Sequence, residues 1–235
     1  MNMNAMILCG GLSTRLGDIT KSIPKILLEI GDRTVLDWQL GALTAAGFDT
    51  VTLAAGHLAE TLKRVVGDEH LGMNLSYVIE DKKLGTGGAI KNALGLVPQP
   101  REPTLILNGD ILTITAYADI IAALRPKSDG IILGSLVDDA SSYGTLNFRS
   151  DDGLLLSFEE KRGIVESAHI NGGIYLFTPH IHQYFPKKEI FSIEYDVFPH
   201  VKNLDVFPSR HPWIDVGVPE RLAWARENWQ LFIMK

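Results

Sequence analysis

The beginning of the fold is decided by the stretch Ala5-Met6-Ile7-Leu8-Cys9-Gly10-Gly11-Leu12-Ser13-Thr14-Arg15. Its apolar part predicts a buried strand. The two glycines stand where that strand ends, so the backbone there can take positive φ and approach a ligand closely. Consecutive N–H groups in such a turn form an anion-binding nest. Arg15 and, after Pro24, Lys25 bring two positive charges to the same region. Together these residues favour a triphosphate site, although a glycine pair by itself would be explained better by a surface turn.

The composition is that of a globular protein with a sizeable core. The chain has 235 residues, of which 46% are hydrophobic and 21% charged. A net charge of −6 argues against non-specific nucleic-acid binding, which needs a basic face. The single Cys9 excludes an intramolecular disulfide, and no apolar run has the length of a membrane span. Because no signal-peptide pattern precedes the first strand, we expect a cytoplasmic protein without membrane or nucleic-acid partners.

Apolar runs alternate with helical patterns through the first half of the chain. Such alternation is typical of βαβ units and a mostly parallel sheet. Ligands of these sheets bind outside the carboxyl ends of the strands, a rule that places Gly10, Gly11, Gly85–Gly88 and Asp110 along one edge. The predicted strands are Ala5–Leu8, Thr50–Ala54, Leu75–Ile79 and Thr104–Leu107, and the predicted helices are Val35–Ala46, His57–Val66, Thr86–Leu94 and Tyr117–Leu124.

The second half has a different pattern, with strand-like runs separated only by short turns. It predicts antiparallel strands added to the same sheet, and no linker, repeat or low-complexity tract divides the chain. We therefore expect a single α/β domain over residues 1–235. The predicted strands are Gly130–Leu136, Thr145–Phe148, Leu154–Phe158 and Gly173–Phe177, and the predicted helices are His180–Tyr184, Glu194–Val201 and Pro219–Trp229.

Two motifs place an aspartate directly after a strand-like run: Leu107-Asn108-Gly109-Asp110 and Trp213-Ile214-Asp215-Val216-Gly217. A carboxylate at such a position can hold Mg²⁺, which proteins usually bind through one or two carboxylates together with substrate phosphates. An isolated Asn-Gly-Asp is more often an aspartate that caps a turn. The repetition of the pattern near both ends of the chain favours the metal interpretation.

The segment Leu84-Gly85-Thr86-Gly87-Gly88-Ala89 opens a predicted helix with three glycines. It is either a flexible turn with Thr86 as the N-cap or a rim against which a flat base can lie, since side chains there would block the plane. Glu80, at the end of the preceding strand, has a carboxylate that only accepts hydrogen bonds. It could therefore receive both N1–H and the N2 amino group of guanine, although a solvated charge is a plausible alternative.

With these motifs in view, the glycine turn resembles the loop G-G-x-[GS]-T-R-x(n)-P-K of the sugar-phosphate nucleotidyltransferases. Ser13 stands where many members have glycine. Further elements match in the same order: Tyr143-Gly144-Thr145 resembles their Y-G-x, Phe158-Glu159-Glu160-Lys161 their E-E-K, and Asn171-Gly172-Gly173-Ile174-Tyr175 their N-[AG]-G-[IVL]-Y. The resemblance extends from Met6 to about Arg226 and implies a Rossmann-like nucleotidyltransferase fold, with a nucleotide-binding half (1–125) and a sugar-phosphate-binding half (126–235).

The resemblance also implies a role for each matching residue. The catalytic set is Arg15, Lys25 and Asp110, and the Mg²⁺ ligands are Asp110 and Asp215. The nucleotide is expected to contact Leu8, Gly10, Gly11, Ser13, Thr14, Glu80, Gly85, Thr86 and Gly87. The sugar phosphate is expected to contact Tyr143, Gly144, Glu160, Lys161, Asn171 and Gly172. Phe191-Ser192-Ile193-Glu194 also occurs in one branch of the family, and the sequence gives no physical reason for it beyond Ser192 capping a helix.

The implied reaction joins a nucleoside triphosphate to a sugar 1-phosphate and releases pyrophosphate. Whole-chain similarity favours the branch that uses GTP and D-glycero-D-manno-heptose 1-phosphate, for surface polysaccharide or glycan synthesis. The alternatives are GTP with mannose 1-phosphate and UTP with N-acetylmuramic acid 1-phosphate, the latter disfavoured because those enzymes carry Glu where Gly85 stands. A catalytically silent regulatory subunit is a further alternative, although such relatives tend to lose the phosphate-binding Arg or a metal-binding Asp. A homodimer is left open.

Overall fold

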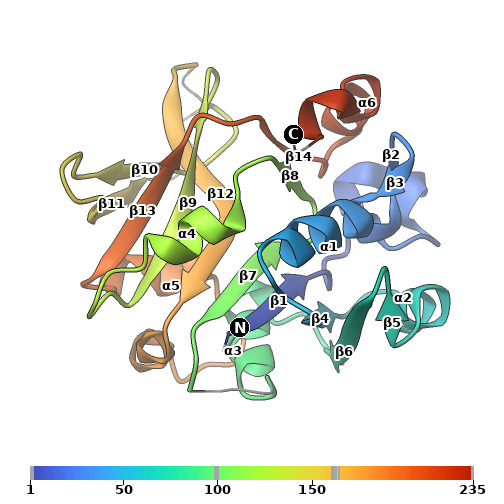
Figure 1. Cartoon of the computed structure of the whole chain (residues 1–235), viewed down its shortest axis with the longest axis horizontal. Helices are drawn as coiled ribbons and strands as arrows, with labels where there is room; N and C mark the ends of the chain where they lie inside the picture. The colour runs from blue at the N-terminus through green and yellow to red at the C-terminus, as the bar shows by residue number, and fades with distance from the viewer. Residues whose placement is uncertain (1–2, 98–100, 160–162, 164, 234–235) are drawn as a thin grey trace.

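A mixed sheet of ten strands runs through both halves of the chain (Figure 1). The computed structural model describes residues 3–97, 101–159, 163 and 165–233. The strand order is β11-β10-β12-β7-β1-β4-β6-β5, with β9 paired to β12 and β13 paired to β9. The strands are β1 (Asn4–Leu8), β4 (Thr50–Ala55), β5 (Glu69–His70), β6 (Met73–Ile79), β7 (Thr104–Asn108), β9 (Gly130–Val137), β10 (Thr145–Phe148), β11 (Leu155–Glu159), β12 (Ala168–Phe177) and β13 (Leu204–Ser209).

Two small ribbons and the helices complete the fold. The ribbons are antiparallel and pair β2 (Glu29–Ile30) with β3 (Arg33–Thr34) and β8 (Ile111–Thr113) with β14 (Trp213–Asp215). The α-helices are α1 (Val35–Ala45), α2 (Ala59–Val66), α3 (Gly85–Leu94), α4 (Tyr117–Ala122), α5 (Ile193–Asp196) and α6 (Pro219–Glu227). The 3₁₀ helices are η1 (Thr14–Thr20), η2 (Lys25–Leu27), η3 (Pro179–Tyr184), η4 (Phe198–His200) and η5 (Trp229–Phe232). Among the described residues no helix is both long and apolar enough to cross a membrane.

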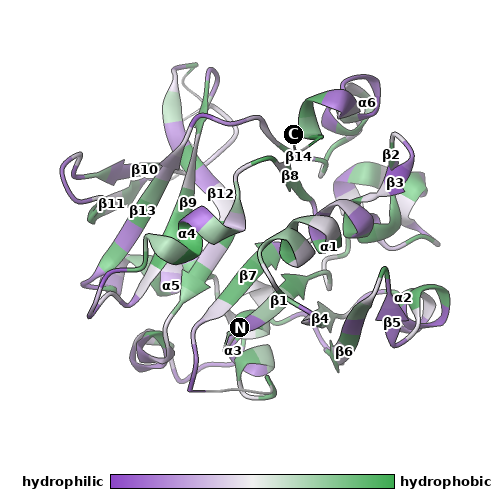
Figure 2. Cartoon of the chain, viewed as in Figure 1, coloured by the Kyte–Doolittle hydropathy of each residue, from purple (hydrophilic) through white to green (hydrophobic). Residues whose placement is uncertain are grey.

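The central parallel strands are buried on both faces, as their continuous apolar sequence requires. Ala5 and Ile7 of β1 point into one hydrophobic cluster with α1, α2, α4 and α6, whereas Met6 points into a second cluster with α3 and α5. Figure 2 shows the hydrophobic residues concentrated along these strands and the helix sides that cover them. This alternation of side-chain direction along the strand fixes which face each helix covers. The confirmed fold class is therefore an α/β sheet flanked by helices.

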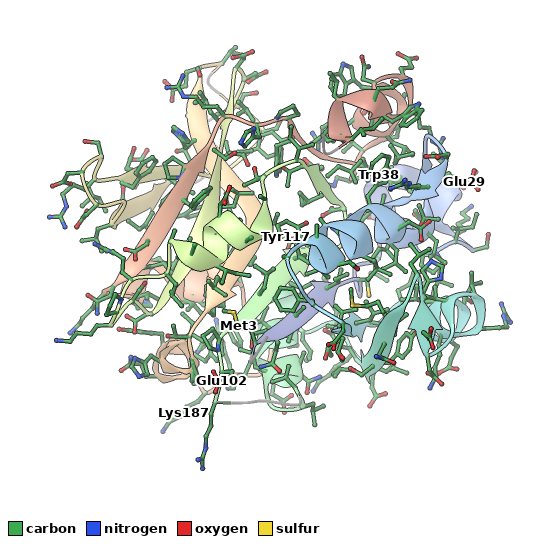
Figure 3. All side chains as sticks on the ribbon, in the orientation of Figure 1. Met3, Glu29, Trp38, Glu102, Tyr117 and Lys187 are labelled. Atoms are coloured by element: carbon green, nitrogen blue, oxygen red, sulfur yellow. The ribbon has the colours of Figure 1, made fainter. Side chains whose placement is uncertain are left out.

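Helix α1 begins at a capping box and supports the edge of the sheet. The Thr34 hydroxyl accepts from the Asp37 N–H at 3.1 Å, and the Asp37 carboxylate accepts from the Thr34 N–H at 2.8 Å. From α1, the Trp38 side chain points toward the C-terminal helices (Figure 3), and its ring centre lies 6.3 Å from that of Trp229. The next residue, the buried Gln39, donates hydrogen bonds from its side-chain amide to the carbonyls of Asn108 and Ile111. Helix α1 thus fixes the loop that follows β7.

Strand β12 joins the two halves of the sheet. Its first residues pair with β10, where Thr145 is opposite Ile170, and its last residues pair with β7 from Ile174 to Phe177. The register against β9 shifts between Asn171 and Tyr175, because Gly173 has a φ of 69°. A bulge of this kind bends the strand. The part of β12 before the Asn171-Gly172-Gly173 motif pairs with β10, and the part after the motif pairs with β7.

Three predictions for the second half differ from the structure. Strand β13 was not predicted, and it pairs in parallel with β9 rather than antiparallel. The predicted helix over Glu194–Val201 is wrong, since α5 ends at Asp196 and η4 follows after a break at Val197. Pro199 explains the break, because it has no N–H and clashes with a continuing helix. Strand β12 also begins five residues before the predicted Gly173.

Candidate functional site

The carboxyl ends of β1, β4, β6 and β7 meet at one edge of the sheet, as parallel strands require. There the Cys9 N–H donates to the Ala54 carbonyl at 2.8 Å, and the Gly109 N–H donates to the Leu8 carbonyl at 2.9 Å. Two cavities open at this edge, and both are lined by Asn108 and Asp110. The Asn-Gly-Asp motif therefore separates two neighbouring pockets.

The first cavity encloses about 230 Å³, and we call it the nucleotide cavity. Its wall brings together predicted residues from four separate segments of the chain. Thr14 and Gly87 are not among the residues that line it. The predicted residues in the wall are Leu8, Gly10, Gly11, Ser13, Lys25, Glu80, Gly85, Thr86 and Asp110, and the residues not predicted are Cys9, Ile26, Ala54, Lys83, Ala89, Asn108 and Gly109.

Neither Gly10 nor Gly11 has the positive φ that the sequence suggested for this turn, and the packing requires a small residue only at Gly10. A Cβ on Gly10 would lie 3.1 Å from the backbone nitrogen of Gly56, so β1 and β4 approach closely here, whereas the space over Gly11 is open. Ser13 has a φ of 51°, a left-handed conformation that costs an L-residue roughly 1–2 kcal/mol. Glycine adopts this conformation without that cost, so a glycine would fit the position of Ser13.

Glu80 lies at the end of β6 with its side chain in the wall of the nucleotide cavity. Burial raises its pKa above the ordinary value, and a backbone hydrogen bond from Leu84 opposes part of that shift. Burial, with the nearby Glu80 adding to it, also raises the pKa of Cys9 to about 12. The thiol is therefore protonated and unreactive at neutral pH, while Glu80 remains a half-buried carboxylate in the cavity.

Lys25 and Asp110 form an ion pair between the two cavities. The Lys25 ammonium lies 2.5 Å from Oδ2 of Asp110, and the two side chains are only 19% and 18% exposed. Each charge is therefore compensated in the free protein, and a ligand that engages either side chain must exchange partners with the other. The sequence placed both residues at the site without predicting that they pair.

The second cavity encloses about 200 Å³, and we call it the acceptor cavity. Of the predicted sugar-phosphate residues, Tyr143, Gly144 and Asn171 line it, together with Arg15, Asp110 and Asp215. Gly172 does not, because a Cβ there would point at the Leu133 carbonyl, 2.8 Å away. Its carbonyl instead accepts from the Trp213 indole N–H at 2.9 Å. Glu160 and Lys161 lie outside the described residues.

Asp215 is held by three hydrogen bonds in the wall of the acceptor cavity. Its Oδ1 accepts from Arg221 at 2.7 Å and from the Gly217 N–H at 3.1 Å, and its Oδ2 accepts from the Tyr143 hydroxyl at 2.8 Å. The Arg221 guanidinium also lies 5.4 Å from the centre of the Tyr143 ring. Burial, with the Asp215 charge adding to it, raises the pKa of Tyr143 well above its usual value. The hydroxyl therefore stays protonated and keeps the carboxylate oriented.

Two carboxylates that could hold a divalent cation approach each other beside Gly217. A Cβ on Gly217 would lie 2.9 Å from Asp215 Oδ1, 3.2 Å from Arg15 Nη2 and 3.4 Å from Asp110 Oδ2, so two carboxylates and the Arg15 guanidinium border the space over this glycine. Among the described residues no group of three or more His, Cys, Asp or Glu side chains is placed to hold a metal. Proteins usually bind Mg²⁺ through one or two carboxylates, and the phosphate oxygens of the substrate complete the set of ligands.

Asn171 uses both of its amide protons within the protein. It donates to Glu194 Oε1 at 2.7 Å and to the Tyr175 hydroxyl at 3.0 Å, and its Oδ1 accepts from the Gly173 N–H at 3.1 Å. A ligand can therefore use Asn171 only as an acceptor. Glu194 lines the acceptor cavity and was not predicted as a site residue. The signal for it was the Phe191-Ser192-Ile193-Glu194 motif that the sequence left without an explanation.

Of the glycines at the start of α3, Gly85 lines the nucleotide cavity, whereas Gly87 and Gly88 do not. A Cβ on Gly87 would lie 2.4 Å from the Phe191 ring, and a Cβ on Gly88 would lie 2.3 Å from the Glu189 carbonyl. Gly87 and Gly88 therefore make room for residues 189–191. Thr86 is not the N-cap either, since α3 begins at Gly85 without a side-chain cap.

The acceptor cavity is also lined by residues that the sequence analysis did not predict, among them Asn108, Phe158, Trp213 and Arg221.

The two cavities and their charged border are those of an enzyme that transfers a nucleotidyl group, and the comparisons with known proteins agree. The model of the nucleotidyl transferase family matches residues 4–230. The chain therefore belongs to the nucleotidyl transferase family, which confirms the family and the enzyme class predicted from the sequence.

Particular relatives share most of the chain. It is 39% identical over 224 residues to the D-glycero-alpha-D-manno-heptose 1-phosphate guanylyltransferase of Campylobacter jejuni, covering 93% of this chain and 96% of that protein. The chain is also 32% identical to a mannose-1-phosphate guanyltransferase of Schizosaccharomyces pombe, and the match covers 62% of that longer protein. Among solved structures, HddC from Yersinia pseudotuberculosis superposes with a TM-score of 0.83 at 30% identity, covering 96% of this chain and 99% of HddC. HddC is also known as a complex with GMP-PN.

Proposed function

We propose that this chain transfers GMP from GTP to D-glycero-D-manno-heptose 1-phosphate, giving GDP-heptose and pyrophosphate. The observation that carries the proposal is the junction of the two cavities at Asn108 and Asp110, with Arg15, Lys25 and Asp215 around it. In this scheme residues 1–125 supply the nucleotide half and residues 126–235 the sugar-phosphate half. The heptose guanylyltransferase relative, which matches over nearly its whole length, supports the choice of substrates.

The nucleotide cavity accounts for GTP through Glu80. The carboxylate accepts two hydrogen bonds from the Watson–Crick edge of guanine, and charge-assisted bonds of this kind are stronger than neutral ones. The triphosphate lies against Gly10 and Gly11 in the cavity wall, where the space over Gly11 is open. Gly85 has a φ of 73°, and a Cβ there would lie 2.6 Å from the Phe191 carbonyl. A glutamate at that position, as in the muramate uridylyltransferases, would force this segment to move.

The chemistry is a direct displacement at phosphorus. An oxygen of the sugar phosphate attacks the α-phosphorus of GTP in line, the new P–O bond forms, and pyrophosphate leaves with the electron pair of the broken bond. The attacking phosphate monoester is already anionic at neutral pH, since its second pKa is about 6, so no general base is needed. Arg15 stabilises the charge that develops on pyrophosphate, and Lys25 holds the α-phosphate and the approach of the nucleophile. Catalysis is then positioning and charge compensation.

Magnesium would be held by Asp110 and Asp215, whose oxygens border the space over Gly217. When bound, it would act as a Lewis acid on the phosphate oxygens. The contribution of the chain is to keep both carboxylates oriented: Lys25 pairs with Asp110, while Tyr143 and Arg221 hold Asp215.

We also propose a cytoplasmic location, which the single cysteine and the need for GTP support. The homodimer left open by the sequence stays a prediction, and sedimentation equilibrium tests it.

The test is a matrix of triphosphates (GTP, ATP, UTP, dTTP) against sugar 1-phosphates (D-glycero-D-manno-heptose, mannose, glucose, N-acetylmuramic acid), with pyrophosphate release as the readout. We expect the highest kcat/KM for GTP with the heptose phosphate. A higher value for mannose 1-phosphate or for UTP would establish one of the alternatives. No release with any pair, in a protein that still binds GTP, would instead indicate a silent regulatory subunit.

A further inference from the structure

The segment Glu189–Glu194, which we call the strap, physically connects the two cavities. At one end it lies on the start of α3, whose Gly85 and Thr86 line the nucleotide cavity. At its other end Glu194 lines the acceptor cavity and accepts a hydrogen bond from Asn171 at 2.7 Å. Helices α3 and α5 contact each other. The strap is therefore a short covalent path between two sites that belong to different halves of the chain.

The strap is attached to α3 mainly through the backbone. The Phe191 N–H donates to the Leu84 carbonyl at 3.0 Å, and the Phe191 carbonyl accepts from the N–H groups of Gly87 and Gly88 at 3.0 and 3.3 Å. The Ile193 N–H donates to the Thr86 hydroxyl at 3.3 Å. Phe191 thus occupies donors that a helix N-terminus otherwise leaves without partners. Hydrogen bonds to the start of α3 therefore set the position of Phe191.

Close packing makes this attachment sensitive to a single methyl group. The Gly88 position would place a Cβ 2.3 Å from the Glu189 carbonyl, and the Gly87 position would place one 2.4 Å from the Phe191 ring. Contacts under 3.0 Å to backbone atoms cannot be relieved by a rotamer change, so the strap must shift. At the far end of the same helix, a Cβ on Gly95 would lie 3.5 Å from the nearest carbonyl, which is an ordinary contact.

We propose that Gly88 and Phe191 are positioning residues for the sugar phosphate. They set the location of the strap and, through Glu194, the orientation of the Asn171 amide in the acceptor cavity, although neither residue lines that cavity. The inference rests on the proposed function, because it takes the acceptor cavity to be the sugar-phosphate site. It assigns an acceptor-recognition role to the glycines that the sequence ascribed to the base.

The experiment compares Gly88→Ala with Gly95→Ala, which adds the same methyl group to the same helix without touching the strap. For Gly88→Ala we expect the KM for the sugar 1-phosphate to rise by roughly 2- to 30-fold, the range found when residues outside a site alter its coupling. The Kd for a non-hydrolysable GTP analogue, measured by calorimetry, should change much less. Gly95→Ala should keep both values of the wild type. A Gly88→Ala protein that weakens both ligands equally, or neither, would overturn the proposal.

A double-variant cycle keeps the test sharp if Gly88→Ala is partly destabilised. Glu194→Gln should raise the same KM, because it removes the charge from the partner of Asn171. If Gly88 acts through Glu194, the double variant should show less than the product of the two single effects. Full multiplicativity would contradict the proposed path. If the wild-type protein releases no pyrophosphate with any sugar phosphate, the proposed function fails instead, and the two failures are thereby distinguished.

Discussion

Replacing Glu80 by glutamine should reduce the preference for GTP over other triphosphates by about ten- to a hundredfold. The Glu80 carboxylate lies half-buried in the nucleotide cavity beside Gly85 and Thr86. Glutamine has nearly the same shape, but its amide oxygen carries no charge and its NH₂ group would face donors of guanine that cannot accept a hydrogen bond. Losing one charge-assisted bond costs roughly 1.5–3 kcal/mol, and each 1.4 kcal/mol is about a factor of ten.

The assay is the ratio of kcat/KM values for GTP and ATP at a fixed concentration of the sugar 1-phosphate. Asp81→Asn is the matched control, since it removes one negative charge from the neighbouring exposed position, which does not line the nucleotide cavity. It should leave the ratio unchanged. A Glu80→Gln ratio that equals the wild-type ratio would refute the reasoning and assign base recognition to the backbone around Gly85 and Thr86.

The pH dependence provides a second check on the same residue. Because burial raises the pKa of Glu80, its carboxylate takes up a proton at a higher pH than an exposed glutamate does. GTP recognition needs the ionised form, so affinity should fall as the pH decreases through this raised pKa, and binding in that range should release protons. Glu80→Gln should lack this dependence. Persistence of the same pH profile in the variant would show that another group titrates.

Three further predictions concern the junction and the acceptor. Asp110→Asn should lower turnover by orders of magnitude even at saturating Mg²⁺, because it leaves the Lys25 ammonium without a negatively charged partner; wild-type rates would remove Asp110 from the catalytic set. Tyr143→Phe keeps the ring beside Arg221 but removes the hydroxyl that orients Asp215, so titrations should show a higher Mg²⁺ requirement, about fivefold for one hydrogen bond of about 1 kcal/mol; an unchanged requirement would contradict this. Lys161→Ala should raise the KM for the sugar 1-phosphate and leave GTP binding by calorimetry nearly unchanged, and equal damage to both ligands would refute the two-cavity division.

The first half of the fold could be predicted closely because local sequence and tertiary structure agree there. Strands β1, β4 and β7 lie in the centre of the sheet and are buried on both faces, so each has a mostly apolar sequence. A glycine follows each strand within two residues. The rule that ligands bind outside the carboxyl ends of parallel strands placed Gly10, Gly85 and Asp110 together, and all three line the nucleotide cavity, whereas Gly87 and Gly88 do not. In contrast, β13 was missed because its short run, with Asp205 and Pro208 in it, is a strand only through its pairing with β9.

The remaining features of the site depend on long-range contacts that no local pattern encodes. Ser13 takes a left-handed φ within the turn. Two of the three hydrogen bonds to the Asp215 carboxylate come from Tyr143, 72 positions away, and from Arg221 in the next helix. The glycines of α3 matched a family motif, but their physical reason is the packing of Phe191 and Glu189. A motif thus located the residues, while only the structure explained them.

The central claim is that the sugar phosphate attacks GTP directly where the two cavities meet at Asp110. The most direct test is the exchange of labelled pyrophosphate into GTP, measured with and without the sugar 1-phosphate. Direct transfer predicts exchange only when the sugar 1-phosphate is present, since pyrophosphate can re-form GTP only by attacking the nucleotide sugar. Exchange at a comparable rate in its absence would show a covalent nucleotidyl intermediate and contradict the account.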